Sequence, residues 1–130
     1  MYCIDTNIII DILRGDKELG SRLNNIINSG VDVFISPIML CELYKGAYLS
    51  NNPEKKIEDI ENFLIFFEIL DLSVAACKEF GYQYTRLRKM GKTTQEIDLM
   101  TASIAKVNNL AVVTRNRKHF ENIDVKIEVW

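Results

Sequence analysis

Hydrophobic residues along this chain occur in two alternating patterns. Short continuous apolar runs, typical of buried strands, cover residues 1–4, 31–35, 66–70, 110–114 and 125–129. Between them, apolar residues recur three or four positions apart, which predicts helices over residues 8–13, 17–28, 37–48, 54–65, 74–90 and 94–107. A short turn or helix is expected at 116–120. Because strands alternate with helices, we expect an α/β fold: a three-layer α/β/α sandwich with a mostly parallel, about five-stranded central sheet.

Polar residues mark where several of these helices should begin. Ser36 followed by Pro37 is the expected N-cap and first-turn pair of the third helix. Thr6 or Asn7 could cap the first helix through a side-chain oxygen.

The sixth helix has a different start signal. Thr93 and Glu96 have the spacing of a capping box. We expect the helix that follows to carry four residues inward: Ile97, Thr101, Ile104 and Val107.

Length and composition predict one compact domain. The chain has 130 residues, of which 48% are hydrophobic, enough for one core and too few for two comfortable domains. We therefore expect a single domain over residues 1–130. The formal net charge is −2, so a nucleic-acid partner would have to be met by a local basic patch. No apolar run approaches the length of a membrane span, and we expect a soluble protein without a membrane partner.

The three cysteines, Cys3, Cys41 and Cys77, lie in apolar stretches without metal-type spacing, and we expect all three to be buried. This unpaired set fits the reducing cytoplasm best. A cysteine–histidine nucleophilic enzyme is set aside, because His119, the only histidine, would need one of these thiols exposed in a cleft.

Three acidic residues stand in apolar surroundings. Asp5 ends the first apolar run, Glu42 follows the second strand closely, and Asp98 lies in the first turns of a packing helix. Each has a structural explanation: a helix N-cap for Asp5, an outward-facing side chain for Glu42, and a favourable position in the helix dipole for Asp98. They also share one property. Each falls near the start of a helix at the carboxyl edge of the sheet, where open α/β sheets bind ligands.

If that edge is shared, three carboxylates converge in one crevice. Like charges a few ångströms apart raise one another's pKa unless a cation lies between them. Hard oxygen ligands without histidine or cysteine select Mg²⁺ or Mn²⁺. Such a site predicts phosphoryl or phosphodiester chemistry.

Two basic clusters could flank this acidic crevice. The first precedes Asp98 and comprises Arg86, Arg88, Lys89 and Lys92. The second follows the next strand and comprises Arg115, Arg117, Lys118 and His119. Each could be an ordinary solvated surface. Beside a metal held by acids, they would suit a polyanion whose scissile phosphate approaches that metal.

The acid-centred segments together resemble the PIN-domain ribonucleases, specifically the VapC-type toxins of toxin–antitoxin pairs. The similar stretches follow in order over nearly the whole chain: residues 4–7, 35–36, 41–43, Gly46, 98–99, 102–105, 113–116, Phe120 and 127–130. Each motif alone is weak. Their order and separations make the combination specific.

The resemblance implies a parallel α/β/α sandwich that cleaves RNA. In that family's pattern, Asp5, Glu42 and Asp98 would bind Mg²⁺ or Mn²⁺, and water activated by the metal would attack the scissile phosphate. Four polar residues would orient carboxylates, water or substrate: Thr6, Asn7, Thr114 and Asn116. The residues expected to contact RNA are Arg86, Arg88, Lys92, Arg115, Arg117, Lys118 and His119.

Asn116 departs from the family pattern, because many relatives carry a fourth acid there. One ligand of a second cation is then missing, so a one-metal and a two-metal centre both remain open. The amide can still accept a hydrogen bond from water or coordinate through its oxygen. For His119 we favour a surface or phosphate contact over a role as general acid. Thr6 and Thr114 have alternatives as an N-cap and a strand-end hydroxyl.

The resemblance also implies a cognate antitoxin that covers the active face, and a homodimer. Apolar helix faces that could supply these contacts, or equally form core, carry Tyr44, Tyr48, Phe63 and Phe67. Two alternatives stay open: a PIN-like module that binds RNA or protein without cleavage, and a housekeeping RNA-processing nuclease. A phosphoaspartyl hydrolase would carry a second aspartate two residues after Asp5, where this chain has Asn7.

Overall fold

One sheet of five parallel strands forms the centre of the protein, and the computed structural model describes all of residues 1–130. The strands are Tyr2–Ile4 (β1), Val33–Ile35 (β2), Glu68–Ile69 (β3), Ala111–Thr114 (β4) and Lys126–Val129 (β5). The helices are Thr6–Leu13 (α1), Lys17–Asn28 (α2), Pro37–Leu49 (α3), Pro53–Leu64 (α4), Val74–Lys89 (α5) and Glu96–Val107 (α6), with a short 3-10 helix at Arg117–His119 (η1). The predicted α/β fold with a parallel sheet is confirmed.

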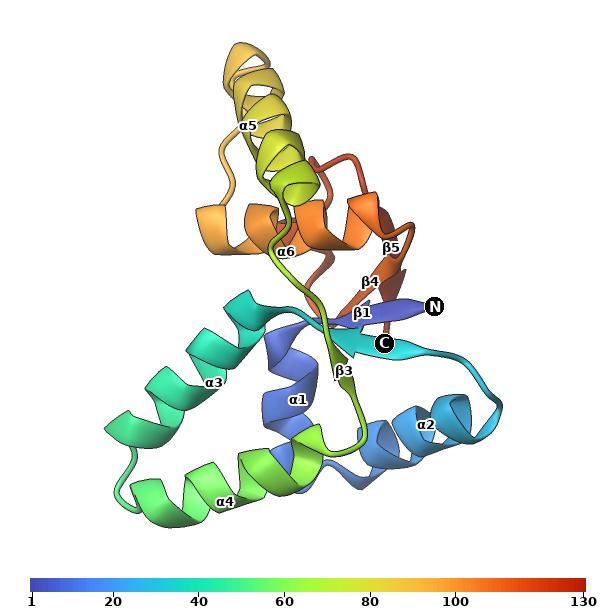
Figure 1. Cartoon of the computed structure of the whole chain (residues 1–130), viewed down its shortest axis with the longest axis vertical. Coiled ribbons are helices and arrows are strands. Elements are labelled where there is room, and N and C mark those ends of the chain that lie inside the picture. The colour runs from blue at the N-terminus through green and yellow to red at the C-terminus, as the bar shows by residue number, and fades with distance from the viewer.

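Helices cover both faces of this sheet (Figure 1). α1, α2 and α4 lie on one side, α5 and α6 lie on the other, and α3 packs against α1 and α4. The strand order is β3-β2-β1-β4-β5, so the chain builds one half of the sheet outward from β1 and then returns to β4 on the other side of β1. The crevice outside the carboxyl ends of β1 and β4 lies at this reversal, where open α/β sheets bind ligands.

The core is densest around β1 and the start of α1. Ile4, Ile8 and Ile9 are fully buried, as is Val113 on the neighbouring strand. Burying one such side chain stabilises the fold by about 1.5–3 kcal/mol. The turn between Ile4 and Ile8 is therefore held firmly from both ends, and Asp5 lies within it.

The helix starts agree only in part with the sequence patterns. Ser36 caps α3 as predicted, because its Oγ accepts a hydrogen bond of 3.2 Å from the backbone N–H of Met39. At α1, the N-cap residue is Asp5 and no side chain caps the helix, so the predicted capping by Thr6 or Asn7 is wrong. The Thr6 hydroxyl is instead engaged with a carboxylate on α3.

The start of α6 also differs from the prediction. The helix begins at Glu96 with Gln95 as its N-cap residue and no side-chain cap, so the predicted capping box at Thr93 is wrong. Residues 92–95 form a connection without helix or strand instead, and Gly91, two residues after the end of α5, turns the chain with a φ of +68°.

The inward face of α6 is partly as predicted. Thr101 and Ile104 are buried, whereas Ile97 and Val107 are 37% and 39% exposed. The buried face of α6 is therefore displaced around the helix axis from the predicted face, and it includes Asp98. An acid therefore occupies a position where the periodicity alone would place an apolar residue.

The cysteines divide between core and surface. Cys3 is buried as predicted, but Cys41 and Cys77 are exposed, so their predicted burial is wrong. They occupy the outer sides of α3 and α5, where Leu43 and Ala76 take the core-facing positions. None of the helices combines the length and the apolar content that a membrane crossing requires.

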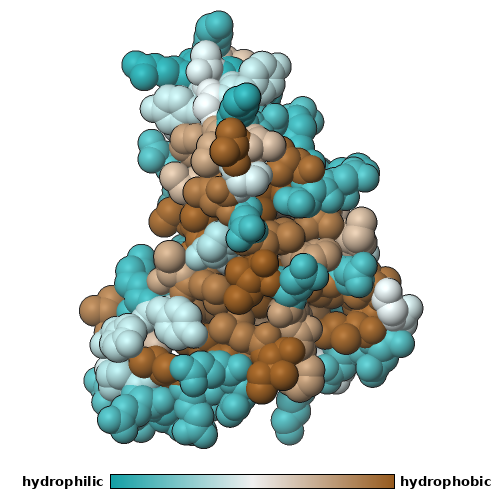
Figure 2. All heavy atoms as spheres, viewed as in Figure 1, coloured by the Kyte–Doolittle hydropathy of each residue, from teal (hydrophilic) through white to brown (hydrophobic).

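An apolar strip is visible on one face of the molecule. Figure 2 shows hydrophobic side chains across the middle of that face, over β3 and its flanks, with hydrophilic side chains towards both ends. Exposed apolar residues at and beside β3 are between 40 and 76% exposed: Ile65, Phe66, Ile69, Leu72 and Val74. We call these five residues the β3 strip.

Candidate active site

Asp5 and Thr114 are brought together by the pairing of β1 with β4. Ile4 lies opposite Val113 in the register, so the next residue of each strand emerges at the same edge. Thr114 Oγ1 donates a hydrogen bond of 2.7 Å to Asp5 Oδ2, and both side chains are buried. The predicted proximity of these two residues at the sheet edge is therefore present in the structure.

Glu42 joins the same region through Thr6. The buried Thr6 hydroxyl on α1 donates a hydrogen bond of 2.5 Å to Glu42 Oε2 on α3. Thr6 follows Asp5 directly, so one short turn holds one acid and orients a second. Asn7, the next residue, is exposed on the first turn of α1.

Asp98 enters from the other face of the sheet, on the first turn of α6. The residue is only 9% exposed, and its Oδ2 has no hydrogen-bond partner. His119 Nδ1 lies 3.5 Å from that oxygen, an ion pair only when the imidazole is protonated. Burial raises the pKa of Asp98 to about 6, with His119 opposing the shift and Asp5 and Glu42 reinforcing it.

Asn116 links the Thr114 hydroxyl to His119. Its backbone N–H donates to Thr114 Oγ1 at 3.0 Å, and its side-chain amide lies 2.7 Å from His119 Nε2. Thr94 Oγ1 also donates to the backbone carbonyl of His119 at 3.3 Å, which ties the segment to the start of α6. The predicted positioning residues Thr114 and Asn116 thus form one polar network with His119.

The three acids affect one another electrostatically. Burial raises the pKa of Asp5, while hydrogen bonds from Thr114 and the backbone of Thr6 lower it, and the charge of Glu42 raises it again. Asp5 and Glu42 in turn raise the pKa of Asp98. Carboxylates from three separate segments therefore lie at one edge of the sheet, near enough for their charges to influence one another.

These acids offer the oxygen donors that a hard divalent cation requires. The buried, unpartnered Asp98 Oδ2 is an acceptor that a cation would satisfy. No three His, Cys, Asp or Glu side chains stand close enough to form a closed ligand set. Mg²⁺ usually takes only one or two carboxylates and keeps several waters, so an open arrangement around Asp5 and Asp98 fits that cation.

The predicted RNA-contacting residues fall into two groups. Arg86 and Arg115 are engaged with protein partners: Arg86 Nη2 donates to the Asn122 carbonyl at 2.9 Å, and Arg115 Nη1 pairs with Asp11 and Asp16 at 3.0 and 3.3 Å. The other predicted residues are more open. Lys118 and His119 line a cavity with Asp98, Arg88 and Lys92 line an adjacent one, and Arg117 is exposed.

A polar pair at this edge was not predicted from the sequence. Ser36 Oγ and Thr101 Oγ1 lie 3.2 Å apart, and both residues are buried. The pair joins the start of α3 to α6 one turn beyond Asp98. The spacing of three residues between Asp98 and Thr101 places both on one helix face, and this spacing could have indicated that Thr101 lies near the acids.

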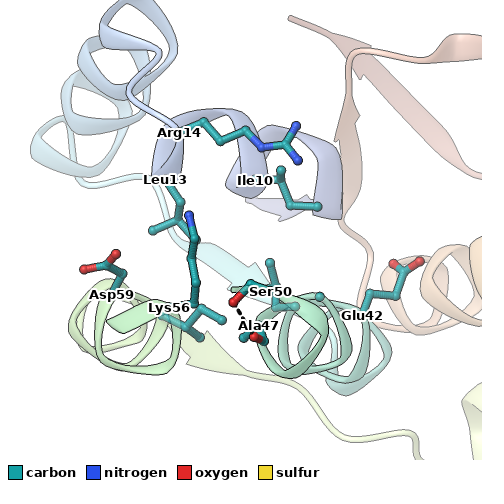
Figure 3. A pocket seen from close by; sticks show the side chains of 11 residues that line it. Ile10, Leu13, Arg14, Glu42, Ala47, Ser50, Lys56 and Asp59 are labelled. Carbon is teal, nitrogen blue, oxygen red and sulfur yellow. Dashed lines mark hydrogen bonds between the residues drawn. The ribbon is translucent and has the colours of Figure 1, made fainter. Parts of the chain in front are cut away.

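A groove opens beside Glu42, between α1, α3 and α4 (Figure 3). Its apolar lining includes Ile10, Leu13 and Ile60. Figure 3 shows Glu42 at one end and Asp59 at the other, with Arg14 and Lys56 on the α1 and α4 sides. The groove therefore combines an apolar lining with charges of both signs and leads to one of the three acids.

Fold and site together define an α/β domain with three acids at the carboxyl edge of a parallel sheet. Comparison with known proteins identifies its family. The model of the PIN domain matches residues 2–126, so the chain belongs to the PIN-domain family. The resemblance drawn from the sequence motifs is confirmed.

Within that family the chain is similar to VapC proteins over nearly its full length. Ribonuclease VapC2 of Haemophilus influenzae is 37% identical, covering 99% of this chain and 97% of that protein. The tRNA(fMet)-specific endonuclease VapC of Shigella flexneri is 32% identical with the same coverage. A crystal structure of VapBC2 from Rickettsia felis, bound to a DNA fragment from its promoter, superposes with a TM-score of 0.93 at 29% identity, covering 99% of this chain and 98% of that one.

Proposed function

We propose that this protein is a VapC-type endoribonuclease toxin that uses Mg²⁺ or Mn²⁺ to hydrolyse RNA phosphodiester bonds and is neutralised by a cognate antitoxin in the cytoplasm. The observation that carries the proposal is that Asp5, held by Thr114, Glu42, held by Thr6, and Asp98, whose buried Oδ2 has no partner, all lie at the carboxyl edge of the sheet. Membership of the PIN-domain family and the ribonuclease names of the full-length relatives support it.

In this proposal Asp5 and Asp98 hold the cation, because they are the two buried acids of the site, and burial raises the pKa of each more than their polar neighbours lower it. Thr114 fixes the orientation of the Asp5 carboxylate through its hydrogen bond, and Thr6 does the same for Glu42. When bound, the cation supplies positive charge for the phosphate and acidity that activates water. Lys118 and His119, which line the cavity with Asp98, position the phosphate of the substrate.

The direct test is cleavage of labelled RNA by the purified protein with Mg²⁺, with Mn²⁺ and with a chelator. Asp5→Asn and Asp98→Asn should each lower the rate by at least about 100-fold, because each removes a charge that holds the cation. Asp71→Asn, at an exposed position before α5, is the matched control and should cleave at the rate of the wild type. Cleavage that persists in chelator, or in folded Asp5→Asn protein, would contradict the proposal.

A second candidate is a PIN-like module that binds RNA or protein without cutting it. The observation in its favour is that the acids do not form a closed ligand set. The same cleavage experiment separates the two functions. A folded wild type that binds RNA but leaves it intact under all metal conditions would favour the binding module.

For the antitoxin, we propose that a segment of that protein occupies the groove between α1, α3 and α4. An amphipathic segment would place apolar side chains against Ile10, Leu13 and Ile60 and reach Glu42 at one end. Occupation of the groove would then obstruct the acidic crevice. Leu13→Glu, at a partly buried position in the groove, should weaken capture of a co-expressed antitoxin, whereas Tyr82→Glu, exposed on α5 outside the groove, should not.

For the homodimer, the β3 strip is the surface we propose. Among the residues considered from the sequence, Tyr48 is 69% exposed, whereas Tyr44, Phe63 and Phe67 pack partly against the core. The β3 strip extends along an edge strand of the sheet, and large exposed apolar patches of this kind mark association surfaces. Phe66→Glu should convert a dimer to a monomer in light scattering, whereas Tyr82→Glu on the outside of α5 should not.

A further inference from the structure

Two adjoining cavities extend from Asp98 along the connection between α5 and α6. The first contains Asp98, Lys118 and His119 and has no hydrophobic residue in its lining; we call it the Asp98 cavity. The second contains Tyr84, Arg88, Lys92 and Glu96; we call it the Tyr84 cavity. Thr93 and Thr94 line both, so the two form a continuous path over the surface.

The Tyr84 cavity has the features of a site for an aromatic ligand with a phosphate. Tyr84 is 40% exposed, and its ring stacks on Phe80 with centroids 6.1 Å apart and planes at 29°, which holds it in place. Arg88 lies one turn further along α5, and Gly91 turns the chain so that Lys92 lines the same cavity. A ring beside two cations is the arrangement that binds an unpaired nucleotide, by stacking on its base and pairing with its phosphate.

Glu96 adds a carboxylate to this otherwise basic lining. A carboxylate repels phosphate but accepts hydrogen bonds, so it selects for the donor edge of a base. Guanine presents two adjacent donors, N1–H and the N2 amine, to a single carboxylate. Adenine and cytosine each present one amine next to an acceptor, and uracil presents one imide N–H between two carbonyls.

We propose that the Tyr84 cavity binds one unpaired RNA base, with guanine preferred, adjacent to the cleavage site. This inference rests on the proposed ribonuclease function. The base stacks on Tyr84 and donates to Glu96, its phosphate pairs with Arg88 and Lys92, and the strand continues past Thr93 and Thr94 to Asp98. The cavity has a volume of about 280 Å³, enough for a nucleobase.

The test is fluorescence anisotropy with labelled RNA in chelator, so that binding is measured without cleavage. The probes are a ten-nucleotide oligouridylate and the same oligomer with one central guanosine or adenosine. The wild type should bind the guanosine probe roughly 5-fold tighter than the others. Tyr84→Ala should lose roughly 5- to 100-fold in affinity for it, and Tyr84→Phe should keep most of it, because stacking needs only the ring.

Matched controls lie on the same helix. Tyr82 is 64% exposed and lines neither cavity, so Tyr82→Ala should bind like the wild type. Glu96→Gln should abolish the preference for guanosine without weakening binding of the oligouridylate. Lys92→Ala should weaken binding of all three probes and reduce the salt slope by about one, whereas Lys89→Ala, outside both cavities, should not.

The results separate this site from the nuclease activity. If Tyr84→Ala binds as tightly as the wild type, or Tyr82→Ala loses as much, the base site is overturned even if Mg²⁺-dependent cleavage is observed. Equal affinity of the wild type for the three probes overturns the guanine preference. If the wild type binds the guanosine probe through Tyr84 but cuts no RNA with any metal, the base site stands and the nuclease proposal fails.

Discussion

Thr114 Oγ1 donates a hydrogen bond of 2.7 Å to Asp5 Oδ2, although the two residues are 109 positions apart in the chain. The same oxygen accepts a hydrogen bond from the backbone N–H of Asn116 at 3.0 Å, which leaves the hydroxyl proton for Asp5. The bond lowers the pKa of Asp5 against the effect of burial. Thr114 thus helps to keep a buried acid ionised and fixed in orientation.

The variant Thr114→Val retains the shape of this side chain and removes the hydroxyl. We expect the pKa of Asp5 to rise further and the cleavage rate near neutral pH to fall roughly tenfold, in line with the effect of losing an outer partner of a metal ligand. The free energy of unfolding should also fall by about 1–3 kcal/mol, because the N–H of Asn116 loses its acceptor. Cleavage rates and urea unfolding measure both effects.

Thr114→Ser is the control for that experiment. It keeps the hydroxyl and should restore most of the cleavage rate and of the stability. Wild-type rates in folded Thr114→Val protein would show that the hydrogen bond to Asp5 has no role in the reaction.

Asp98 should make the stability of the metal-free protein depend on pH. Burial raises its pKa from 3.8 to about 6, so the folded protein favours the protonated acid. A raised pKa contributes stability that is fully present below the unfolded value and is lost as the pH rises through the folded value. Between about pH 4 and pH 7, this group should lower the free energy of unfolding by about 2 kcal/mol.

Urea unfolding of the wild type and Asp98→Asn across this range isolates that contribution. The wild type should lose more stability than the variant as the pH rises, and Asp71→Asn should behave like the wild type because Asp71 is exposed. Identical pH slopes for the wild type and Asp98→Asn would show that Asp98 is not in a buried, charge-repelling environment.

A divalent cation should reverse this loss. At about pH 7.5, above the pKa of about 6 of Asp98, Mg²⁺ should raise the melting temperature of the wild type by a few degrees, because it binds the folded state only. Asp5→Asn and Asp98→Asn should show a smaller rise or none, and Asp71→Asn should respond fully. The absence of any Mg²⁺ or Mn²⁺ effect on the wild type would argue against a cation site here, independently of any activity measurement.

Much of this site could be predicted from the sequence because the hydrophobic pattern indicates where the strands end. Asp5 and Thr114 each follow an apolar strand, and Glu42 and Asp98 lie in early helical turns at the same edge. In a parallel sheet with helical connections, all strands end on one side, so residues in these positions share one edge whatever their distance along the chain. The strand order, which places β1 between β2 and β4, then brings them close together.

The choice of partner for each polar group could not be predicted in the same way. From the sequence, Thr6 could cap its own helix or bind Glu42. The packing of α1 against α3 brings Glu42 within hydrogen-bond distance, so the Thr6 hydroxyl binds Glu42. Arg115 was predicted to contact RNA, yet it forms ion pairs with Asp11 and Asp16, which lie in α1 and at the start of α2. These outcomes depend on distances between elements, which periodicity does not contain.

The cysteines offer a simple check on the burial found in the structure. Burial, helped by the charge of Asp5, raises the pKa of the Cys3 thiol to about 12, while Cys41 and Cys77 are exposed. Because the thiolate is the reactive form, iodoacetamide at about pH 8 should modify the two exposed thiols of the native protein and spare Cys3 until the chain is unfolded. Intact mass and peptide mapping measure this. Cys41 precedes the site residue Glu42 but faces solvent, so the protein modified at both Cys41 and Cys77 should keep its cleavage rate. Modification of Cys3 before unfolding would contradict the buried position of β1.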